Sequence, residues 1–192
     1  MATSTCELTF YPESPDKPLK IGNIFSGPAA SSCITIDKAS EIPGPDTDPL
    51  ILYIVAHGIP NGVIREGIKV SDVSLAKTIR HHRRGAATLI VWDVCFAKSF
   101  LKVAHLGKWP SNYVHIFSCQ AHERTWQVSG KGSQKQTLFS TELRAALGRL
   151  KTSGKAKTWG KLEEQLQTQL YPIQTPSIHP KNRSRLQHFD LP

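Results

Sequence analysis

The chain has 192 residues, 39% of them apolar, which is enough for one domain around a continuous core. No stretch reaches the roughly 18 uninterrupted apolar residues of a membrane-spanning helix, and the polar N-terminus lacks the basic-then-apolar order of a secretory signal. Four scattered cysteines are too few for a disulfide framework. We therefore expect a single soluble, cytoplasmic domain over residues 1–192, with reduced thiols and no membrane partner.

The formal charge of +9 is concentrated in the second half of the chain. Residues 1–93 carry nine Lys and Arg against ten Asp and Glu, whereas residues 94–192 carry fifteen against five. Such an excess favours nucleic acid as a partner. The basic residues are dispersed, however, with little aromatic interleaving and no nucleic-acid motif. A solvated basic surface is the preferred interpretation, and nucleic acid is the less favoured partner.

The first 49 residues give the weakest pattern. Residues 7–11 and 33–36 are short strand candidates between turns, and residues 43–49 are a loop by composition. Residues 50–58 read LILYIVAHG, a near-continuous apolar run that is typical of a strand buried on both faces of a parallel sheet. The Pro-Asn-Gly sequence at 60–62 then predicts a turn, with a small hairpin over residues 63–70.

A helix is predicted from a cap at Ser71 or Asp72 to about residue 84, where Gly85 ends it. A second apolar run, ATLIVWDVC, covers residues 87–95. Another helix is predicted over residues 98–106, before the third run, YVHIFSC, at 113–119. This alternation of strands and helices predicts an α/β fold with a mainly parallel central sheet and helices on both faces.

The remaining chain alternates loops and helices. Residues 129–136 are rich in Gly, Ser and Lys and are expected to form a mobile loop. Residues 138–150 and 158–170 have helical apolar spacing. The tail, 171–192, contains Pro172, Pro176 and Pro180 and is expected to be largely irregular, with a short edge strand near residues 188–189.

Two apolar runs end in side chains that carry chemistry, His57 and Cys95. Ligands bind at the carboxyl ends of strands in open α/β sheets. A thiol becomes a nucleophile as thiolate, which a neighbouring histidine base can generate. The N–H groups of Gly58 and Cys95 could receive a developing oxyanion, because glycine allows the backbone to approach a substrate closely.

At these motifs the sequence resembles the clan of caspase-like cysteine peptidases, which includes caspases, metacaspases, legumains and gingipains. Residues 53–58, YIVAHG, match an apolar strand ending in His-Gly, and residues 89–95, LIVWDVC, match one ending in an acid, a variable residue and the cysteine. Weaker likeness continues through IFSCQAHE at 116–123 and TLFS at 137–140, so that it covers roughly residues 50–150. The resemblance implies a caspase-like fold and a cysteine endopeptidase.

The resemblance also implies a specificity. Asp93 lies two residues before Cys95 and, in an extended strand, on the same side. In metacaspase-like members the matching acid forms the floor of the primary pocket, which implies cleavage after Arg or Lys, with Arg favoured for its bidentate geometry. Ser118 and Glu123 are implied as further substrate-binding residues. Lys131 and Lys135, in the expected mobile loop, are candidate self-processing positions.

The chain departs from the metacaspase pattern in three respects. The N-terminal strand and helix that usually precede the histidine motif are shortened. Phe-Ala-Lys follows Cys95, in place of the small residues usual there, and no aspartate occurs between Asp93 and Asp190. The aspartate cluster that the family uses for calcium therefore has no counterpart, and we expect neither calcium activation nor another cofactor.

Several alternatives remain open. Cys119 and His122, with His115 nearby, have metal-like spacing, but no second pair completes a zinc site, so no metal is expected. A cysteine at a strand end is often simply packed. The chain could therefore be a catalytically inactive caspase-like binding module for an acidic protein or nucleic acid, or a thiol hydrolase or transferase for a non-peptide substrate. An active enzyme would take a protein or peptide substrate and be regulated by a separate protein or by oligomerisation.

Overall fold

The structure is a computed structural model that describes residues 8–9, 19–20, 50–65, 68–82, 87–102, 109, 111–129, 135–153, 158–179 and 189–190. The strand candidate at 33–36 and the loop at 43–49 lie outside these residues.

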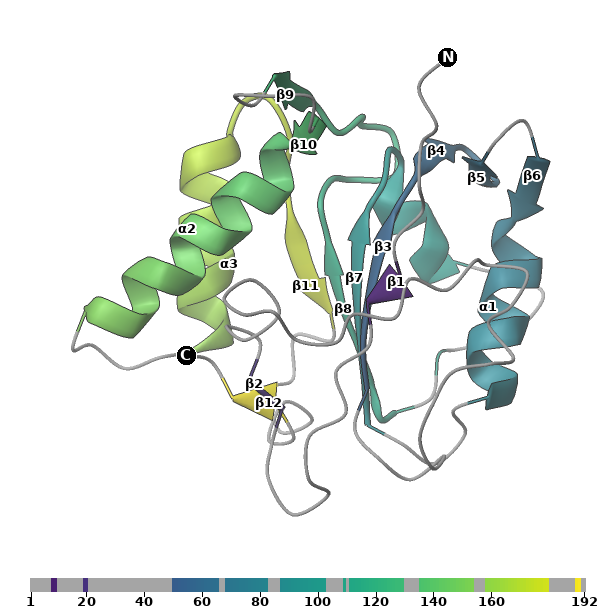
Figure 1. Cartoon of the computed structure of the whole chain (residues 1–192), viewed down its shortest axis with the longest axis horizontal. Coiled ribbons are helices and arrows are strands. Elements are labelled where there is room, and N and C mark those ends of the chain that lie inside the picture. The colour runs from purple at the N-terminus through teal and green to yellow at the C-terminus, as the bar shows by residue number, and fades with distance from the viewer. Residues whose placement is uncertain are drawn as a thin grey trace.

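A five-stranded sheet forms the centre of the molecule, in the order β1-β3-β7-β8-β11 (Figure 1). Its strands are β1 (Leu8–Thr9), β3 (Leu50–Val55), β7 (Thr88–Asp93), β8 (Tyr113–Phe117) and β11 (Ser177–His179). The three long strands β3, β7 and β8 run parallel, and the short edge strands β1 and β11 are antiparallel to their neighbours. The predicted α/β class with a mostly parallel central sheet is confirmed.

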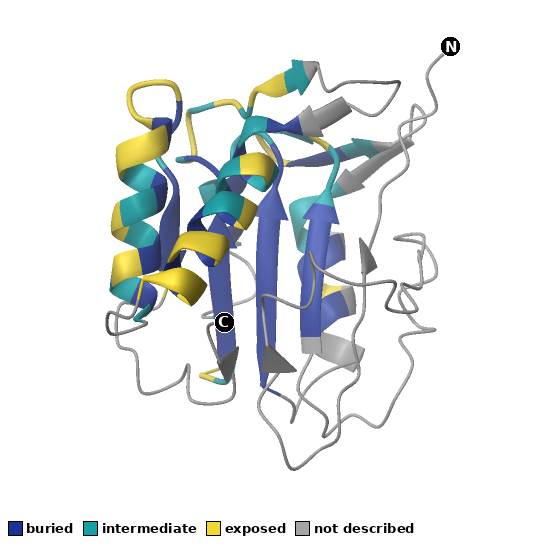
Figure 2. Ribbon diagram, turned by 60° about the vertical axis from the view of Figure 1, so that its left-hand side comes forward, coloured by how far each residue is buried: buried dark blue, intermediate teal, exposed yellow. Residues whose placement is uncertain are grey.

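Helices cover both faces of the sheet. In Figure 1, α2 (Leu138–Thr152) and α3 (Trp159–Leu170) lie on one side, and α1 (Asp72–His82) lies on the other, together with the 3-10 helix η3 (Ala97–Lys102). In Figure 2, β7 and β8 are buried along their length, and β3 is buried over residues 51–54.

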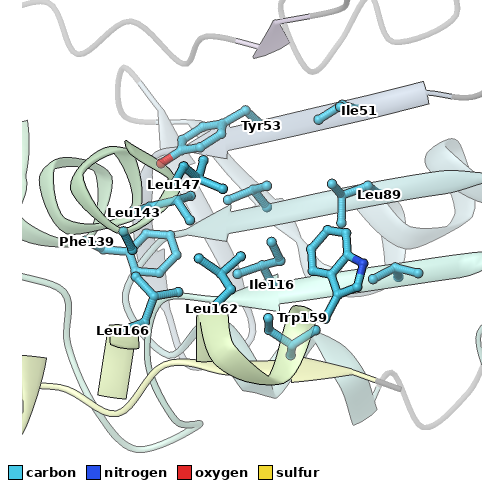
Figure 3. Close-up of a cluster of buried hydrophobic side chains, with 14 of the residues drawn as sticks. Ile51, Tyr53, Leu89, Ile116, Phe139, Leu143, Leu147, Trp159, Leu162 and Leu166 are labelled. Atoms are coloured by element: carbon cyan, nitrogen blue, oxygen red, sulfur yellow. The ribbon is translucent and has the colours of Figure 1, made fainter. Parts of the chain in front are cut away.

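The burial follows the two-residue period of the strands. Ile51, Leu89 and Ile116 face α2 and α3, where they pack against Leu143 and Leu162 (Figure 3). The residues that alternate with them along each strand face the other way and pack on α1 and η3. Two separate hydrophobic cores therefore hold the sheet, which explains why its strands are apolar on both sides.

Trp92 anchors the second of these cores near the end of β7. Its ring stacks on Phe100 of η3 with centroids 4.5 Å apart, and its Nε1 donates to Nδ1 of the buried His115 on β8 at 3.0 Å. The indole donor is thus satisfied in the core, as a buried tryptophan requires. This packing fixes the end of β7, where Asp93 and Cys95 follow.

The described residues also form three small sheets outside the central one. β4 (His57–Ile59), β5 (Gly62–Arg65) and β6 (Ile68–Ser71) form an antiparallel meander, so that His57 itself starts a strand and the predicted hairpin gains a third member. Ile59 pairs with Gly62, which adopts a φ of 152° that suits glycine. β9 (Gln127–Ser129) pairs with β10 (Lys135–Thr137), and β2 (Leu19–Lys20) pairs with β12 (Phe189–Asp190).

Three local expectations need correction. The segment after Cys95 is a 3-10 helix that begins at Ala97, where an α-helix over residues 98–106 was expected. Both ends of the expected mobile loop at 129–136 are paired as β9 and β10. The proline-containing tail supplies β11 to the central sheet, because its pairing with β8 and the covering helix α3 compensate for weak local propensity.

Candidate functional site

The ends of β3 and β7 bring the two predicted catalytic residues to the same edge of the sheet. The strands pair in parallel up to Val55 and Asp93, and His57 and Cys95 each follow two residues later. They therefore occupy equivalent positions beyond the ends of two adjacent strands. The prediction that these strands are neighbours is confirmed by their register.

Gly58 touches the backbone of Cys95 directly. A Cβ atom placed on Gly58 would lie 2.0 Å from the carbonyl oxygen of Cys95 and 2.7 Å from its nitrogen, closer than real Cβ contacts allow. The sequence suggested that glycine lets the backbone approach a substrate. In the structure, glycine is required because two parts of the chain approach each other. The two residues named as oxyanion donors are consequently in contact.

The Cys95 thiol is half-buried and faces Thr125. Its Sγ lies 3.7 Å from Oγ1 and 4.0 Å from the carbonyl oxygen of Thr125. His57 is exposed, and within the described residues its imidazole makes no hydrogen bond to Cys95. Phe96, the next residue, has a φ of 59°. A non-glycine residue in this left-handed region is held by its surroundings, and such residues cluster at functional sites.

Asp93 is fully buried directly before this turn and binds the start of α2. Its Oδ2 accepts hydrogen bonds from the hydroxyl groups of Tyr53 at 3.1 Å, Ser140 at 2.5 Å, and Thr137. Figure 3 shows the hydroxyl end of Tyr53 directed toward α2. Among the described residues, Oδ1 of Asp93 has no partner, although it too is buried.

Burial determines the titration of this cluster. Desolvation raises the pKa of Asp93, and the hydrogen bonds from Ser140, Thr137 and Tyr53 offset only part of that rise. Burial, followed by the nearby Asp93 charge, raises the pKa of Tyr53 well above its usual value. The tyrosine therefore remains a hydrogen-bond donor.

Residues 118–126, here called the middle loop, hold the Cys95 turn in place. Ser118 is fully buried, its N–H donates to the Trp92 carbonyl at 3.0 Å, and its hydroxyl donates to the Val94 carbonyl at 3.1 Å. The N–H of Phe96 donates to the Glu123 carbonyl at 2.8 Å. Ser118 thus supports the turn from beneath, and its implied contact with substrate stays a prediction.

Cys119 lies in the same support. Its buried thiol donates to the carbonyls of Val94 at 3.4 Å and Glu123 at 3.5 Å. Burial raises the pKa of this thiol to about 11, so it is protonated at neutral pH. Of the two cysteines that the structure describes, Cys95 is the accessible one.

Glu123 connects the middle loop to residues 171–176, here called the C-terminal loop. Its Oε2 accepts from the amides of Gln120 at 2.9 Å and Thr175 at 2.8 Å, and its Oε1 accepts from the Thr175 hydroxyl at 2.8 Å. Burial alone would raise the pKa of Glu123, but these hydrogen bonds outweigh it, and the pKa is lowered. The carboxylate that was implied as substrate-binding is already occupied by donors of the protein itself.

Sequence reasoning missed most of these partners. They come from three separate parts of the chain, and only the folded topology brings them to the site: Tyr53, Thr125, and the pair Gln174 and Thr175. Gln174 is fully buried and donates to the Ser118 carbonyl at 3.0 Å. No local pattern marks such residues in a single sequence.

The remaining predicted positions are only partly placed. Lys131 lies outside the described residues, and Lys135 begins β10. Among the described residues, no group of three or more His, Cys, Asp or Glu side chains could hold a metal ion.

None of the helices in the described part of the chain has both the length and the apolar character needed to cross a membrane.

No family model matches the chain, and no curated protein matches its sequence. Among solved structures, the chain is similar to protein GSU0716 from Geobacter sulfurreducens, with 16% identity over 74% of this chain and 69% of that one, and a TM-score of 0.46. An identity and a TM-score this low assign neither a fold family nor a function.

Proposed function

We propose that the chain is a caspase-like cysteine endopeptidase that cleaves after basic residues. The observation that carries the proposal is the parallel register of β3 and β7, which sets His57 and Cys95 at equivalent positions beyond neighbouring strand ends, with Gly58 against the Cys95 backbone. The half-buried, accessible position of the thiol is compatible with attack on a bound peptide.

In the proposed reaction, His57 takes the proton of the Cys95 thiol, and the sulfur attacks the scissile carbonyl carbon. The N–H groups of Gly58 and Cys95 stabilise the oxyanion. Collapse of the tetrahedral intermediate breaks the C–N bond, and the amine leaves with the proton from His57. Water then hydrolyses the thioester: its proton passes through His57, the acid product departs, and the thiol is restored.

Asp93 is the proposed selector of a basic side chain. The unpartnered, buried Oδ1 supports this role, because an arginine or lysine of the substrate would supply its missing donor. A guanidinium would form the better-oriented contact. The three hydroxyl groups on Oδ2 would hold the carboxylate in position for that contact.

The test is a panel of fluorogenic peptides with Arg, Lys, Asp or Asn at the scissile position, assayed with wild-type protein and with Cys95→Ala. We expect cleavage of the Arg and Lys peptides by the wild type only. Asp93→Asn should abolish that preference, whereas cleavage by Cys95→Ala at the wild-type rate would refute the assignment. Intact mass spectrometry of the same two proteins tests self-cleavage at Lys131 or Lys135.

A second candidate is a caspase-like binding module without catalysis. Two observations favour it: the Cys95 thiol faces Thr125, and the three hydroxyl groups on Asp93 give that residue a structural task. Binding of an acidic protein or nucleic acid that weakens steeply with salt, with none of the peptides cut, would support this alternative.

A further inference from the structure

The N–H of the Phe96 peptide, directly after Cys95, is held by a residue of another loop. Phe96 donates to the Glu123 carbonyl at 2.8 Å while it adopts a φ of 59°. A bulky residue keeps this left-handed conformation only when its surroundings over-determine it. The geometry of the Cys95 turn therefore depends on where the Glu123 carbonyl lies.

The position of Glu123 depends in turn on the C-terminal loop. Both carboxylate oxygens of Glu123 are bonded to Thr175, through its amide and its hydroxyl. The neighbouring contacts act in the same direction, since Gln120 Nε2 donates to the Thr175 carbonyl at 3.0 Å and Gln174 spans Ser118 and the Trp126 amide. A chain of hydrogen bonds thus leads from Thr175 through Glu123 to the peptide beside Cys95.

This connection also sets the cover over the thiol. Thr125, which lies against Cys95 Sγ, is two residues after Glu123 in the same middle loop. Glu123 is only half-buried, and all of its carboxylate partners are neutral donors of the protein. Its side chain is therefore placed to order the loop.

We propose that Glu123 is a positioning residue for Cys95, through which the C-terminal loop at Thr175 controls the geometry and accessibility of the thiol. This inference rests on the proposed function for its effect on turnover, and on the hydrogen bonds alone for its effect on the thiol. It replaces the substrate-binding role that the sequence implied for Glu123.

The experiment compares Thr175→Val, which removes only the hydroxyl donor, with Thr175→Ser, which keeps it, and with Glu123→Gln. Cys95 alkylation by iodoacetamide is followed by site-resolved mass spectrometry, well below the unfolding transition of each variant. We expect alkylation to become about tenfold faster in Thr175→Val and Glu123→Gln, because the loop over the thiol opens more often. Thr175→Ser should stay close to the wild type.

Ile79→Val is the control for general destabilisation, because it removes a buried methyl group from α1, and Ile79 takes no part in the described hydrogen bonds that join Thr175, Glu123 and Phe96. Its Cys95 alkylation rate should match the wild type. If Thr175→Val and Glu123→Gln also match the wild type, or if Ile79→Val speeds alkylation equally, the proposal is wrong.

Peptide cleavage by the same variants separates positioning from substrate binding. A positioning role lowers kcat and leaves KM unchanged. A higher KM for Arg peptides in Glu123→Gln, with unchanged alkylation, would restore the substrate-binding role and overturn the proposal. If the wild type cuts none of the peptides, the proposed function fails, while the alkylation rates still decide whether Glu123 positions Cys95.

Discussion

The backbones of Gly58 and Cys95 touch where the chain leaves β3 and β7, and this contact limits what position 58 can hold. A side chain at Gly58 would meet backbone atoms that cannot rotate away, at 2.0 Å from the Cys95 carbonyl oxygen. We expect Gly58→Ala to lower the free energy of unfolding by about 3 kcal/mol, since overpacking against backbone has no cheap relief. Urea unfolding measures this change.

Gly148 provides a matched control, because nothing lies within 4 Å of a Cβ built on it. It is an exposed residue in the middle of α2, so Gly148→Ala should raise the free energy of unfolding by about 0.5–1 kcal/mol. Equal effects of the two substitutions would show that the Gly58–Cys95 contact is not as close as described.

Asp93 gives a prediction about pH. Because burial raises its folded-state pKa, the folded protein holds this proton at pH values where the unfolded chain has lost it. Its contribution to stability is complete below the ordinary carboxyl pKa and decreases as the pH rises toward the raised folded value. Within that window, the free energy of unfolding falls by up to about 1.4 kcal/mol per pH unit.

The substitution Asp93→Asn removes this titration and leaves the other groups in place. Urea unfolding of both proteins between pH 4 and pH 7 should therefore show the variant gaining stability relative to the wild type as the pH rises. Parallel curves across the whole range would mean that Asp93 titrates alike in the folded and unfolded states.

At the scale of elements, the start of α2 is linked to the site through its cap. Thr137 accepts from the Ser140 amide at 3.0 Å and also donates to Asp93. Thr158 caps α3 in the same way, by accepting from the Lys161 amide at 3.2 Å, on an exposed surface. The two helices are therefore capped by the same type of residue, threonine, but the two threonines differ in what else they bind.

We expect Thr158→Val to cost about 1 kcal/mol, the usual effect of losing a cap. Thr137→Val should cost about 2 kcal/mol more, because the buried carboxylate also loses a hydrogen-bond donor. Thermal or urea unfolding of the two variants provides the comparison. Similar losses would indicate that the contact between Thr137 and Asp93 adds little stability.

The elements that could be predicted are those with strong local signals. β3, β7 and β8 are continuous apolar runs, and α2 and α3 combine apolar periodicity with a threonine N-cap. β11 has only three residues among prolines, and it is a strand because β8 pairs with it. The same division holds for the site. His57, Asp93 and Cys95 mark strand ends, whereas tertiary contacts alone bring Thr125 to Cys95 and Thr175 to Glu123.

At the scale of the whole molecule, helix α3 closes one edge of the central sheet. β11 is the last strand, and an edge strand offers its outward backbone groups to any further strand. Here Glu163 accepts from the Ile178 amide at 3.1 Å, and Gln167 donates to the Pro176 carbonyl at 3.1 Å. These two side chains, one helical turn apart, form hydrogen bonds with the backbone groups that a further strand would pair with.

Removing both of these side chains should leave the edge of the sheet open to pairing. We expect Glu163→Ala/Gln167→Ala to expose the Ile178 amide to faster hydrogen exchange and to increase self-association in sedimentation velocity experiments over a range of protein concentrations. The control, Glu164→Ala/Thr168→Ala, alters exposed residues of the same helix, where Glu164 pairs with Lys161 at 2.7 Å. Because that pair lies in solvent and adds little to stability, the control should exchange and sediment like the wild type. If both double variants do so, the side chains of α3 do not protect the sheet edge, and β11 is shielded by its own short length.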